Sequence, residues 1–229
     1  MTTTKQHQFW RLDGPESQTR LAEWDDEMDY LETIHCPVDP GHQRAGRRMP
    51  NLSVALPGSD ADDFVWTWKS ECLIQDRVLR LFRERRVTGF EVKPVSARFV
   101  RSKKTPPVLW ELVVTGWAGM ASPESGVMLN KEKSCSVCGH LTYTGLTDNS
   151  KLIKPEQWDG SDMFLVWPLP KFVFITDRLC QLIETHSLTG CRFVKPNEFN
   201  EMDGFSPGRL SYSMPETRAR ELGEPLGIY

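Results

Sequence analysis

Residues 66–89, WTWKSECLIQDRVLRLFRERRVTG, are matched 101 positions later by residues 167–190, WPLPKFVFITDRLCQLIETHSLTG, and the two stretches align without a gap. The identical pairs are Trp66/Trp167, Ile74/Ile175, Asp76/Asp177, Arg77/Arg178, Leu81/Leu182, Thr88/Thr189 and Gly89/Gly190. Trp, Asp-Arg and Thr-Gly recur in the same order, and such self-similarity is the mark of an internal repeat. The sequence therefore predicts two copies of one structural unit.

Each copy has the pattern of a strand, a helix, a turn and a returning strand. Residues 172–175 form an aromatic and β-branched run that favours a buried strand. Thr176 suits the N-cap of the helix that follows, with Asp177 in the first turn, where the helix dipole favours an anion. Gly89 and Gly190 suit the turn after each helix, because glycine adopts a left-handed conformation at little cost.

Between the copies, residues 108–114 are apolar on both faces of a period-2 pattern, which predicts a central, covered strand. We expect an α+β fold in which two similar strand–helix–strand units pack around a mainly antiparallel sheet, with a Cys-x-x-Cys knuckle. We expect one compact domain with four parts. Residues 1–60 form an irregular N-terminal segment with a degenerate knuckle, and residues 61–134 form the first unit plus the central strand. Residues 135–200 form the knuckle plus the second unit, and residues 201–229 form a C-terminal tail.

Composition places the chain among ordinary globular proteins, since 39% of its 229 residues are hydrophobic and 26% are charged. The N-terminal residues lack the apolar core of a secretory signal, and no apolar run is long enough to span a membrane. We therefore expect a cytoplasmic protein with no membrane partner. In that compartment six cysteines are interpreted as thiols or metal ligands rather than three disulfides.

The most specific motif is Cys135-Ser-Val-Cys138-Gly139, because two thiolates at this spacing can fill two tetrahedral positions of a zinc ion. Two further ligands are needed. Residues 35–42, HCPVDPGH, resemble a second knuckle that has lost one cysteine. Cys36 and His42 are the candidates that complete a Cys₃His site.

The sequence also allows other assignments of these residues. Asp39, His35 or His140 can substitute for one of the four zinc ligands. The alternative without metal is a relic knuckle whose glycines still shape the turns. A redox Cys-x-x-Cys pair is the third interpretation, although the usual strand–motif–helix setting is missing.

Charge is distributed unevenly along the chain. Residues 77–104 contain ten Lys or Arg against two Glu, and residues 23–32 contain six acidic side chains and no basic one. The basic stretch is either a surface for an acidic or phosphate-bearing partner or a solvated helix face. For the acidic stretch a solvated helix or loop is favoured over a catalytic or cation site.

Signatures of common enzyme classes do not occur in the sequence. It contains no nucleophile elbow, no P-loop, no dinucleotide-binding glycine motif and no His-Glu-x-x-His. None of the five histidines has a recognisable general-base setting. We therefore assign no catalytic residue and no organic cofactor, and expect a protein that is not an enzyme.

Taken in order, these segments resemble the bacterial double-CXXCG motif paralogous family, from about His35 to Phe199. The resemblance covers the degenerate knuckle 36–41, the helix ending in Val87-Thr-Gly89, the strand 109–114, the knuckle 135–139, the segment 159–164 and the second unit through Gly190. It implies a paired-knuckle metal site. The family pattern has cysteine where this sequence has Asp39.

Some members of that family look like immunity proteins, which neutralise a toxin delivered between neighbouring bacteria. The function we expect is therefore a cytoplasmic immunity-type protein that binds a cognate toxin and occludes its working surface. One alternative is a zinc-knuckle nucleic-acid-binding protein that uses residues 77–104 and binds in a salt-dependent way. The other is a metal-dependent enzyme, which requires an open coordination position on the ion.

Overall fold

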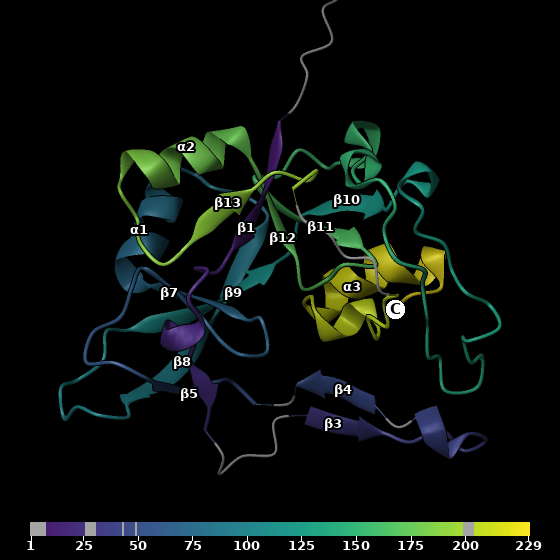
Figure 1. Cartoon of the computed structure of the whole chain (residues 1–229), viewed down its shortest axis with the longest axis horizontal. Helices are drawn as coiled ribbons and strands as arrows, with labels where there is room; N and C mark the ends of the chain where they lie inside the picture. The colour runs from purple at the N-terminus through teal and green to yellow at the C-terminus, as the bar shows by residue number, and fades with distance from the viewer. Residues whose placement is uncertain (1–7, 26–30, 43, 49, 199–203) are drawn as a thin grey trace, which may run out of the picture.

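Two β-sheets, one β-hairpin and three short α-helices make up the described part of the chain (Figure 1). The computed structural model describes residues 8–25, 31–42, 44–48, 50–198 and 204–229. No helix among these residues is long and apolar enough to cross a membrane.

The larger sheet has six strands, and most of its neighbours are antiparallel. Only β5 and β8 run parallel among its pairs within the described residues. In spatial order the strands are β2 (Glu23–Trp24), β5 (Ser53–Leu56), β8 (Phe90–Phe99), β9 (Leu109–Val114), β7 (Cys72–Gln75) and β6 (Phe64–Trp66). The prediction of a central, covered strand is confirmed, because β9 lies between β7 and β8 and is buried along most of its length.

The second sheet has five strands and gathers segments from both ends of the chain. In spatial order they are β10 (Trp117–Met120), β11 (Met163–Trp167), β12 (Val173–Thr176), β1 (Phe9–Asp13) and β13 (Arg192–Val194). The α+β class is therefore as predicted, but two principal sheets stand where one was expected. Each strand–helix–strand segment contributes its strands to a different sheet.

Helix α1 (Asp76–Glu84) follows β7, and helix α2 (Asp177–Thr185) follows β12. Thr176 caps α2 as expected, since its hydroxyl accepts a hydrogen bond from the Leu179 amide. Gly89 and Gly190 adopt φ of +85° and +82°, the left-handed conformation predicted for them. A third helix, α3 (Glu216–Gly223), lies in the C-terminal segment and buries Ala219 and Gly223.

The prediction that residues 1–60 are irregular is wrong, because the described part of this segment contains strands β1 to β5. Strand β1 lies between β12 and β13, so its hydrogen-bonding partners are more than 150 positions away in sequence. A strand of five residues has too short a pattern to be recognised without those partners. The remaining two strands, β3 (Leu31–Ile34) and β4 (Arg44–Arg48), form a separate hairpin (Figure 1).

Strands β1 and β9 occupy corresponding places in the two sheets. Trp10 lies opposite Ile175, and Trp110 lies opposite Ile74. The Trp10 indole donates to the Asp177 carboxylate at 3.2 Å, and the Trp110 indole donates to Asp76 at 3.1 Å. Each tryptophan therefore joins its strand to the first turn of the neighbouring helix.

Alternating side chains of the central strands fill two cores. Ile74 belongs to a large core that includes both sheets, helices α1 and α2, and Ala219 of α3. Leu73, the preceding residue, belongs to a smaller core with Val54 and Phe99. Successive side chains of a strand point to opposite faces, so the six-stranded sheet is covered on both sides.

Candidate metal centre

The structure brings Cys36, His42, Cys135 and Cys138 together, although the two pairs are about a hundred positions apart in sequence. One ligand atom from each residue lies within 4.8 Å of all the others. The Cys36 and Cys135 sulfurs are 3.9 Å apart, and the Cys138 sulfur is 4.0 Å from Nδ1 of His42. These are the four residues that the sequence indicated as zinc ligands.

Their separations suit a tetrahedral zinc ion. Zinc–sulfur bonds of about 2.3 Å and zinc–nitrogen bonds of about 2.0 Å place tetrahedral ligand atoms roughly 3.5 to 3.8 Å apart. The two distances of 3.9 and 4.0 Å lie just beyond that range. Three thiolates and one imidazole also form a donor set typical of structural zinc sites.

Cys135 and Cys138 lie on a tight turn that directs both sulfurs to the same side. The Cys135 amide donates to the His140 carbonyl at 2.8 Å and closes the turn. Gly139 has φ of +67°, and a Cβ there would lie 2.0 Å from the Arg209 side chain. The backbone conformation therefore favours glycine after the second cysteine, whereas the nearby end of the Arg209 side chain is flexible and could move.

Cys36 and His42 are held by the loop that connects β3 to β4. Residues 40–42 form a single 3₁₀ turn, and the Gly41 amide donates to the Asp39 carboxylate at 2.8 Å. The other oxygen of that carboxylate lies 3.3 Å from Nε2 of His42. Asp39 thus contacts the nitrogen of His42 that faces away from the sulfurs, the usual arrangement for an imidazole that ligates a metal.

Electrostatics within the cluster favour a thiolate at Cys135. The backbone amides of Cys138 and Val137, followed by the His42 side chain, lower the pKa of the Cys135 thiol to about 6. Hydrogen bonds with the Cys135 and Cys36 sulfurs raise the pKa of His42. Desolvation raises the pKa of Cys138, so the two cysteines of the motif differ in how readily they ionise.

The substitute ligands that the sequence left open lie outside this group. The His140 ring stacks on His42 with centroids 5.0 Å apart, and its Nε2 lies 3.1 Å from the Thr142 hydroxyl. Asp39 contacts His42 rather than the sulfurs. His35 is not among the clustered ligand atoms. The geometry therefore selects Cys36 and His42 from the candidates in residues 35–42.

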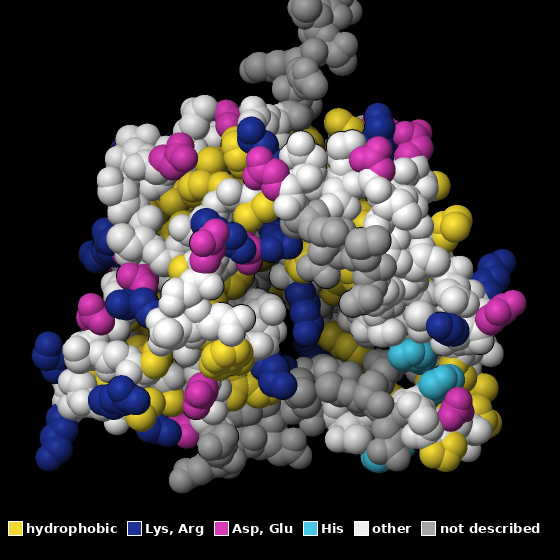
Figure 2. Space-filling model, viewed as in Figure 1, with side chains coloured by type: hydrophobic (Ala, Val, Ile, Leu, Met, Phe, Trp, Pro, Cys, Tyr) yellow, Lys and Arg dark blue, Asp and Glu magenta, His cyan; other side chains and the backbone are white. Residues whose placement is uncertain are grey.

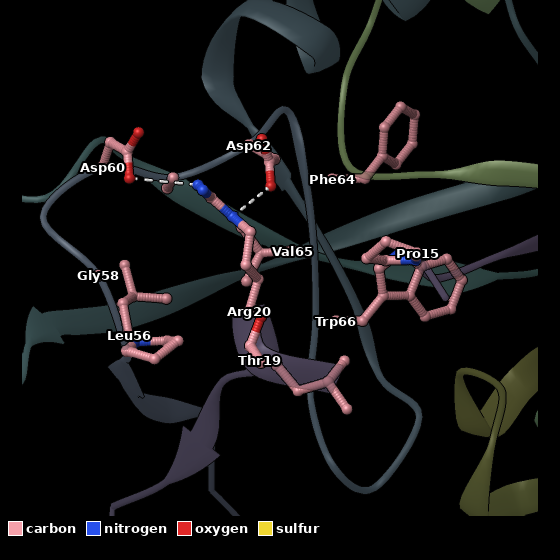
Figure 3. Close-up of a pocket in the computed structure, with 13 residues that line it drawn as sticks. Pro15, Thr19, Arg20, Leu56, Gly58, Asp60, Asp62, Phe64, Val65 and Trp66 are labelled. Atoms are coloured by element: carbon pink, nitrogen blue, oxygen red, sulfur yellow. Dashed lines mark hydrogen bonds and ion pairs between the residues drawn. The ribbon is translucent and has the colours of Figure 1, made fainter. Parts of the chain in front are cut away.

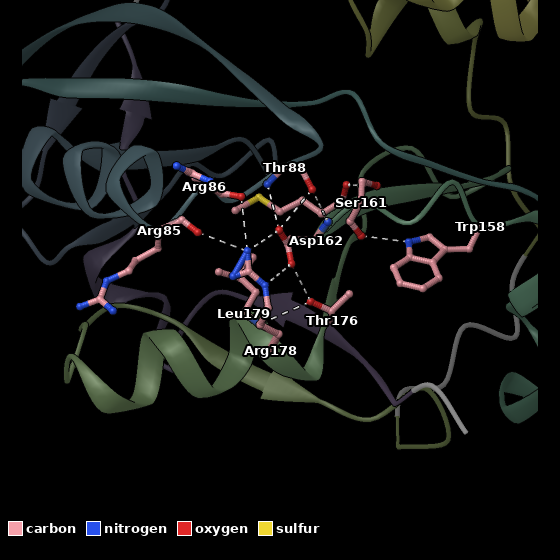
Figure 4. Close-up of polar contacts among 10 residues, drawn as sticks. Arg85, Arg86, Thr88, Trp158, Ser161, Asp162, Thr176, Arg178 and Leu179 are labelled. Atoms are coloured by element: carbon pink, nitrogen blue, oxygen red, sulfur yellow. Dashed lines mark hydrogen bonds and ion pairs between the residues drawn. The ribbon is translucent and has the colours of Figure 1, made fainter. Parts of the chain in front are cut away.

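Sequence reasoning missed a pair of buried carboxylates, Asp63 and Asp162. Figure 4 shows Asp162 accepting hydrogen bonds from the Thr88 amide at 3.0 Å and from the Arg178 guanidinium at 3.0 Å. Asp63 accepts from the Thr189 amide at 2.8 Å and pairs with Arg77. The only signal in the sequence is an Asp directly before each of β6 and β11. Those positions are 99 apart, so the alignment at an offset of 101 does not superpose them.

Three of the ten cationic side chains in the basic stretch 77–104 form ion pairs with described residues. Arg77 pairs with Asp63, Arg80 with Asp76, and Arg98 with Asp25. These contacts reduce the free charge of the basic stretch 77–104. The acidic stretch 23–32 is described only in part, since residues 26–30 lie outside the described residues.

A small cavity beside the six-stranded sheet offers little room for a ligand. Its volume is about 90 Å³, and it is lined by residues of the 15–21 and 56–66 segments (Figure 3). Arg20 spans it and pairs with Asp60 at 3.2 Å and with Asp62 at 2.8 Å. Organic ligands occupy sites of roughly 300 Å³ or more, so this cavity is too small for one.

Compared with known proteins, the chain matches no protein-family model and no curated protein sequence.

Proposed function

We propose that Cys36, His42, Cys135 and Cys138 hold a structural zinc ion, and that the protein acts by binding another protein rather than by catalysis. The observation that carries this proposal is the set of four donor atoms within 4.8 Å of one another. Four protein ligands fill a tetrahedral zinc ion and leave no position for water or substrate. A catalytic zinc keeps such a position open, so the donor set supports a structural ion over a reactive one.

The ion would tie together two segments that are distant in sequence. Cys36 and His42 lie in the loop of the β3–β4 hairpin, and Cys135 and Cys138 lie in a turn of the region between β10 and β11. That region consists mainly of irregular backbone, turns and 3₁₀ helices. Because such a site rarely exists in the unfolded chain, the free energy of metal binding contributes directly to the free energy of folding.

The class of partner that we propose is a bacterial toxin, bound stoichiometrically in the cytoplasm by an immunity-type protein of the double-CXXCG kind. Support comes from the order of the motifs along the chain and from the convergence of both knuckle segments on one cluster. Asp39 stands where that family has cysteine, and its carboxylate contacts His42. His42 then supplies the donor that the lost cysteine would have supplied.

We also propose that the chain contains an internal duplication of a unit of about a hundred residues, in which β1 and β9 are corresponding strands. The supporting observations are the matching registers of Trp10 and Trp110 and the matching lengths of α1 and α2. In this arrangement β1 pairs with β12 and β13 of the second unit, and β9 pairs with β7 and β8 of the first unit. The corresponding first strands are thus exchanged between the units, as in a domain swap within one chain.

The metal proposal is tested by elemental analysis of the freshly purified protein and of the variants Cys36→Ser and Cys135→Ser. We expect one zinc ion per chain in the wild type and none in either variant. Cys191→Ser is the matched control, because Cys191 is a free cysteine outside the cluster, and we expect its zinc content to be unchanged. Wild-type protein purified without metal would refute the zinc centre.

The binding role is tested by identifying the genes that flank this one and co-expressing the protein with any toxin candidate found among them. We expect a complex of one chain with one toxin molecule, and loss of toxicity in proportion to the amount of complex. Protection at substoichiometric amounts of this protein would instead indicate turnover, and would overturn the non-catalytic role.

A further inference from the structure

A cleft of about 430 Å³ lies between the β3–β4 hairpin and the two sheets. Its walls come from β4, from the turn between β6 and β7, from β8 and β9, from the turn between β11 and β12, and from residues 206–214. Figure 2 shows Lys and Arg side chains in a hollow near the middle of this face, above the hairpin. A volume of this size is in the range of specific ligand sites.

Positive charge predominates among the ionisable side chains of this cleft. The cationic residues are Arg47, Arg48, Lys69, Lys93 and Lys171, and the acidic residues are Glu71 and Glu111. Both acidic groups are already engaged: Glu111 pairs with Arg48, and Glu71 accepts from the Trp24 indole at 3.1 Å and from the Thr67 hydroxyl. Within the described part of the chain, Lys69, Lys93 and Lys171 form no ion pair.

The free positive charge of the cleft belongs to its lysines. Arg48 is only 12% exposed and already pairs with Glu111, and Arg47 pairs with Glu216. Lys69, Lys93 and Lys171 are therefore the cations that a carboxylate entering the cleft would meet.

Apolar side chains form the floor of the same cleft. Leu112, Val114, Leu165, Val173 and Met214 line it and are buried. The combination of cations at the walls with an apolar floor fits a ligand that carries both carboxylates and aliphatic side chains. Trp24, His140 and Tyr212 also line the cleft, but they are half-buried. Nucleic-acid channels instead combine an extended cationic track with exposed aromatic platforms, so the cleft favours a protein ligand.

We propose that this cleft binds an acidic segment of the partner protein, with its carboxylates on Lys69, Lys93 and Lys171 and its aliphatic side chains on the apolar floor. This inference rests on the proposed function, since it names the chemistry by which the partner is recognised. Complementary charge accelerates encounter and selects among partners, and the apolar floor adds affinity through burial.

The proposed metal centre would hold one wall of the cleft in place. Arg47 and Arg48 lie on β4, which begins two residues after His42. At its far end the same strand is held by the Arg48–Glu111 pair and by the contact of Arg47 with Glu216 at 3.2 Å. Loss of the ion would free the hairpin loop and displace the wall that carries both arginines.

The experiment measures fluorescence anisotropy of a labelled peptide of alternating glutamate and leucine, titrated with the full-length zinc-loaded protein. A glutamine–leucine peptide and a single-stranded oligonucleotide serve as competing probes. The test variant is Lys69→Glu/Lys93→Glu/Lys171→Glu. The matched control is Lys103→Glu/Lys104→Glu/Lys133→Glu, which changes the net charge equally at exposed lysines outside the cleft.

We expect the test variant to weaken peptide binding by at least about tenfold, and the control by no more than about twofold. Equal losses in both variants would show attraction to net charge alone and would overturn the proposal. So would stronger binding of the glutamine peptide or of the oligonucleotide, or no binding of the acidic peptide to the wild type.

Zinc content measured on the same samples separates this proposal from the proposed function. A cleft variant that keeps its zinc but loses the peptide supports the cleft. A cleft variant that keeps both refutes the cleft and leaves the zinc centre standing. If the wild-type protein contains no zinc but still binds the peptide through the three lysines, the zinc centre is refuted and the cleft is supported.

Discussion

The carboxylate of Asp63 accepts hydrogen bonds from both the amide and the hydroxyl of Thr189, at 2.8 and 3.2 Å. It therefore joins the start of β6 to the turn after α2. An equivalent set of contacts joins the start of β11 to the turn after α1, where Asp162 accepts hydrogen bonds from the amide and the hydroxyl of Thr88 at 3.0 and 3.2 Å. In addition, Phe64 donates its amide to the Thr189 carbonyl, and Met163 donates to the Thr88 carbonyl. The start of β6 is thus bound to the turn after α2, and the start of β11 is bound to the turn after α1.

We expect Asp63→Asn and Asp162→Asn each to lower the free energy of unfolding by about 2 to 4 kcal/mol. Each change removes a buried carboxylate that accepts charge-assisted hydrogen bonds and leaves the donors poorly paired. Urea denaturation monitored by circular dichroism measures the effect. Asp60→Asn is the control, because Asp60 is largely exposed and its pairing with Arg20 is a surface contact, so we expect less than about 1 kcal/mol there. A loss at Asp63 no larger than at Asp60 would contradict the structural role.

Gly89 and Gly190 allow the close approach that these contacts require. A Cβ at Gly89 would lie 2.0 Å from the Met163 carbonyl oxygen, and one at Gly190 would lie 2.1 Å from that of Phe64. We expect Gly89→Ala and Gly190→Ala to destabilise the protein by about 3 kcal/mol or more, since backbone must move in each case.

Gly160 provides a matched control for the two glycine variants. Its φ of +87° is nearly the same, but a Cβ there would meet nothing within 4 Å. Gly160→Ala therefore measures backbone strain alone, which we expect to cost about 1 kcal/mol. Thermal unfolding of the three variants separates the cost of backbone strain from the cost of the steric clash between the added Cβ and the neighbouring carbonyl. Equal losses at all three glycines would show that the close approach contributes nothing.

Asp39 is expected to tune the affinity of the proposed zinc centre. Its carboxylate lies 3.3 Å from Nε2 of His42, and groups in this position typically change metal affinity by about 10- to 100-fold. Asp39→Ala should therefore retain zinc on purification but release it to a chromogenic chelator at a correspondingly lower chelator concentration. Asp60→Asn again serves as the control. An unchanged release profile would mean that His42 is oriented by the loop alone.

The buried thiol of Cys180 and the half-buried thiol of Cys191 predict a loss of stability at alkaline pH. Burial raises the pKa of Cys180 and of Cys191 to about 12, against an ordinary value of about 8.5. Above that ordinary value the unfolded chain releases these protons while the folded protein retains them, so the stabilisation from burial decreases as pH rises from about 9 to 12.

We expect the free energy of unfolding to fall between pH 8 and pH 10 in the wild type, and to fall less steeply in Cys180→Ala/Cys191→Ala. Both proteins share the other groups that titrate at alkaline pH. Comparing how steeply the free energy of unfolding falls with pH in the two proteins therefore removes the contribution of those groups. Urea denaturation at each pH supplies the measurement. Parallel slopes would show that neither thiol titrates differently in the folded and unfolded states.

Local features were predictable from the sequence because they depend on neighbouring residues. The N-cap of α2 at Thr176 requires a hydroxyl at the right position, and the left-handed turns at Gly89 and Gly190 require a residue without Cβ. Strand β9 was recognisable because both of its faces are apolar. For the candidate site, the spacing of Cys135 and Cys138 indicated half of a metal centre without any knowledge of the fold.

The sequence by itself therefore determined the helices, their turns and a set of seven candidate ligands in two segments. Only the tertiary structure decided that Cys36 and His42 join the two cysteines while Asp39 lies behind the imidazole. It also decided that β1 enters the second sheet, that Asp63 and Asp162 cross between the units, and that Arg48 lines a basic cleft. Capping and turn preferences act over a few residues, whereas strand register, burial and ligand convergence depend on groups brought together from distant parts of the chain.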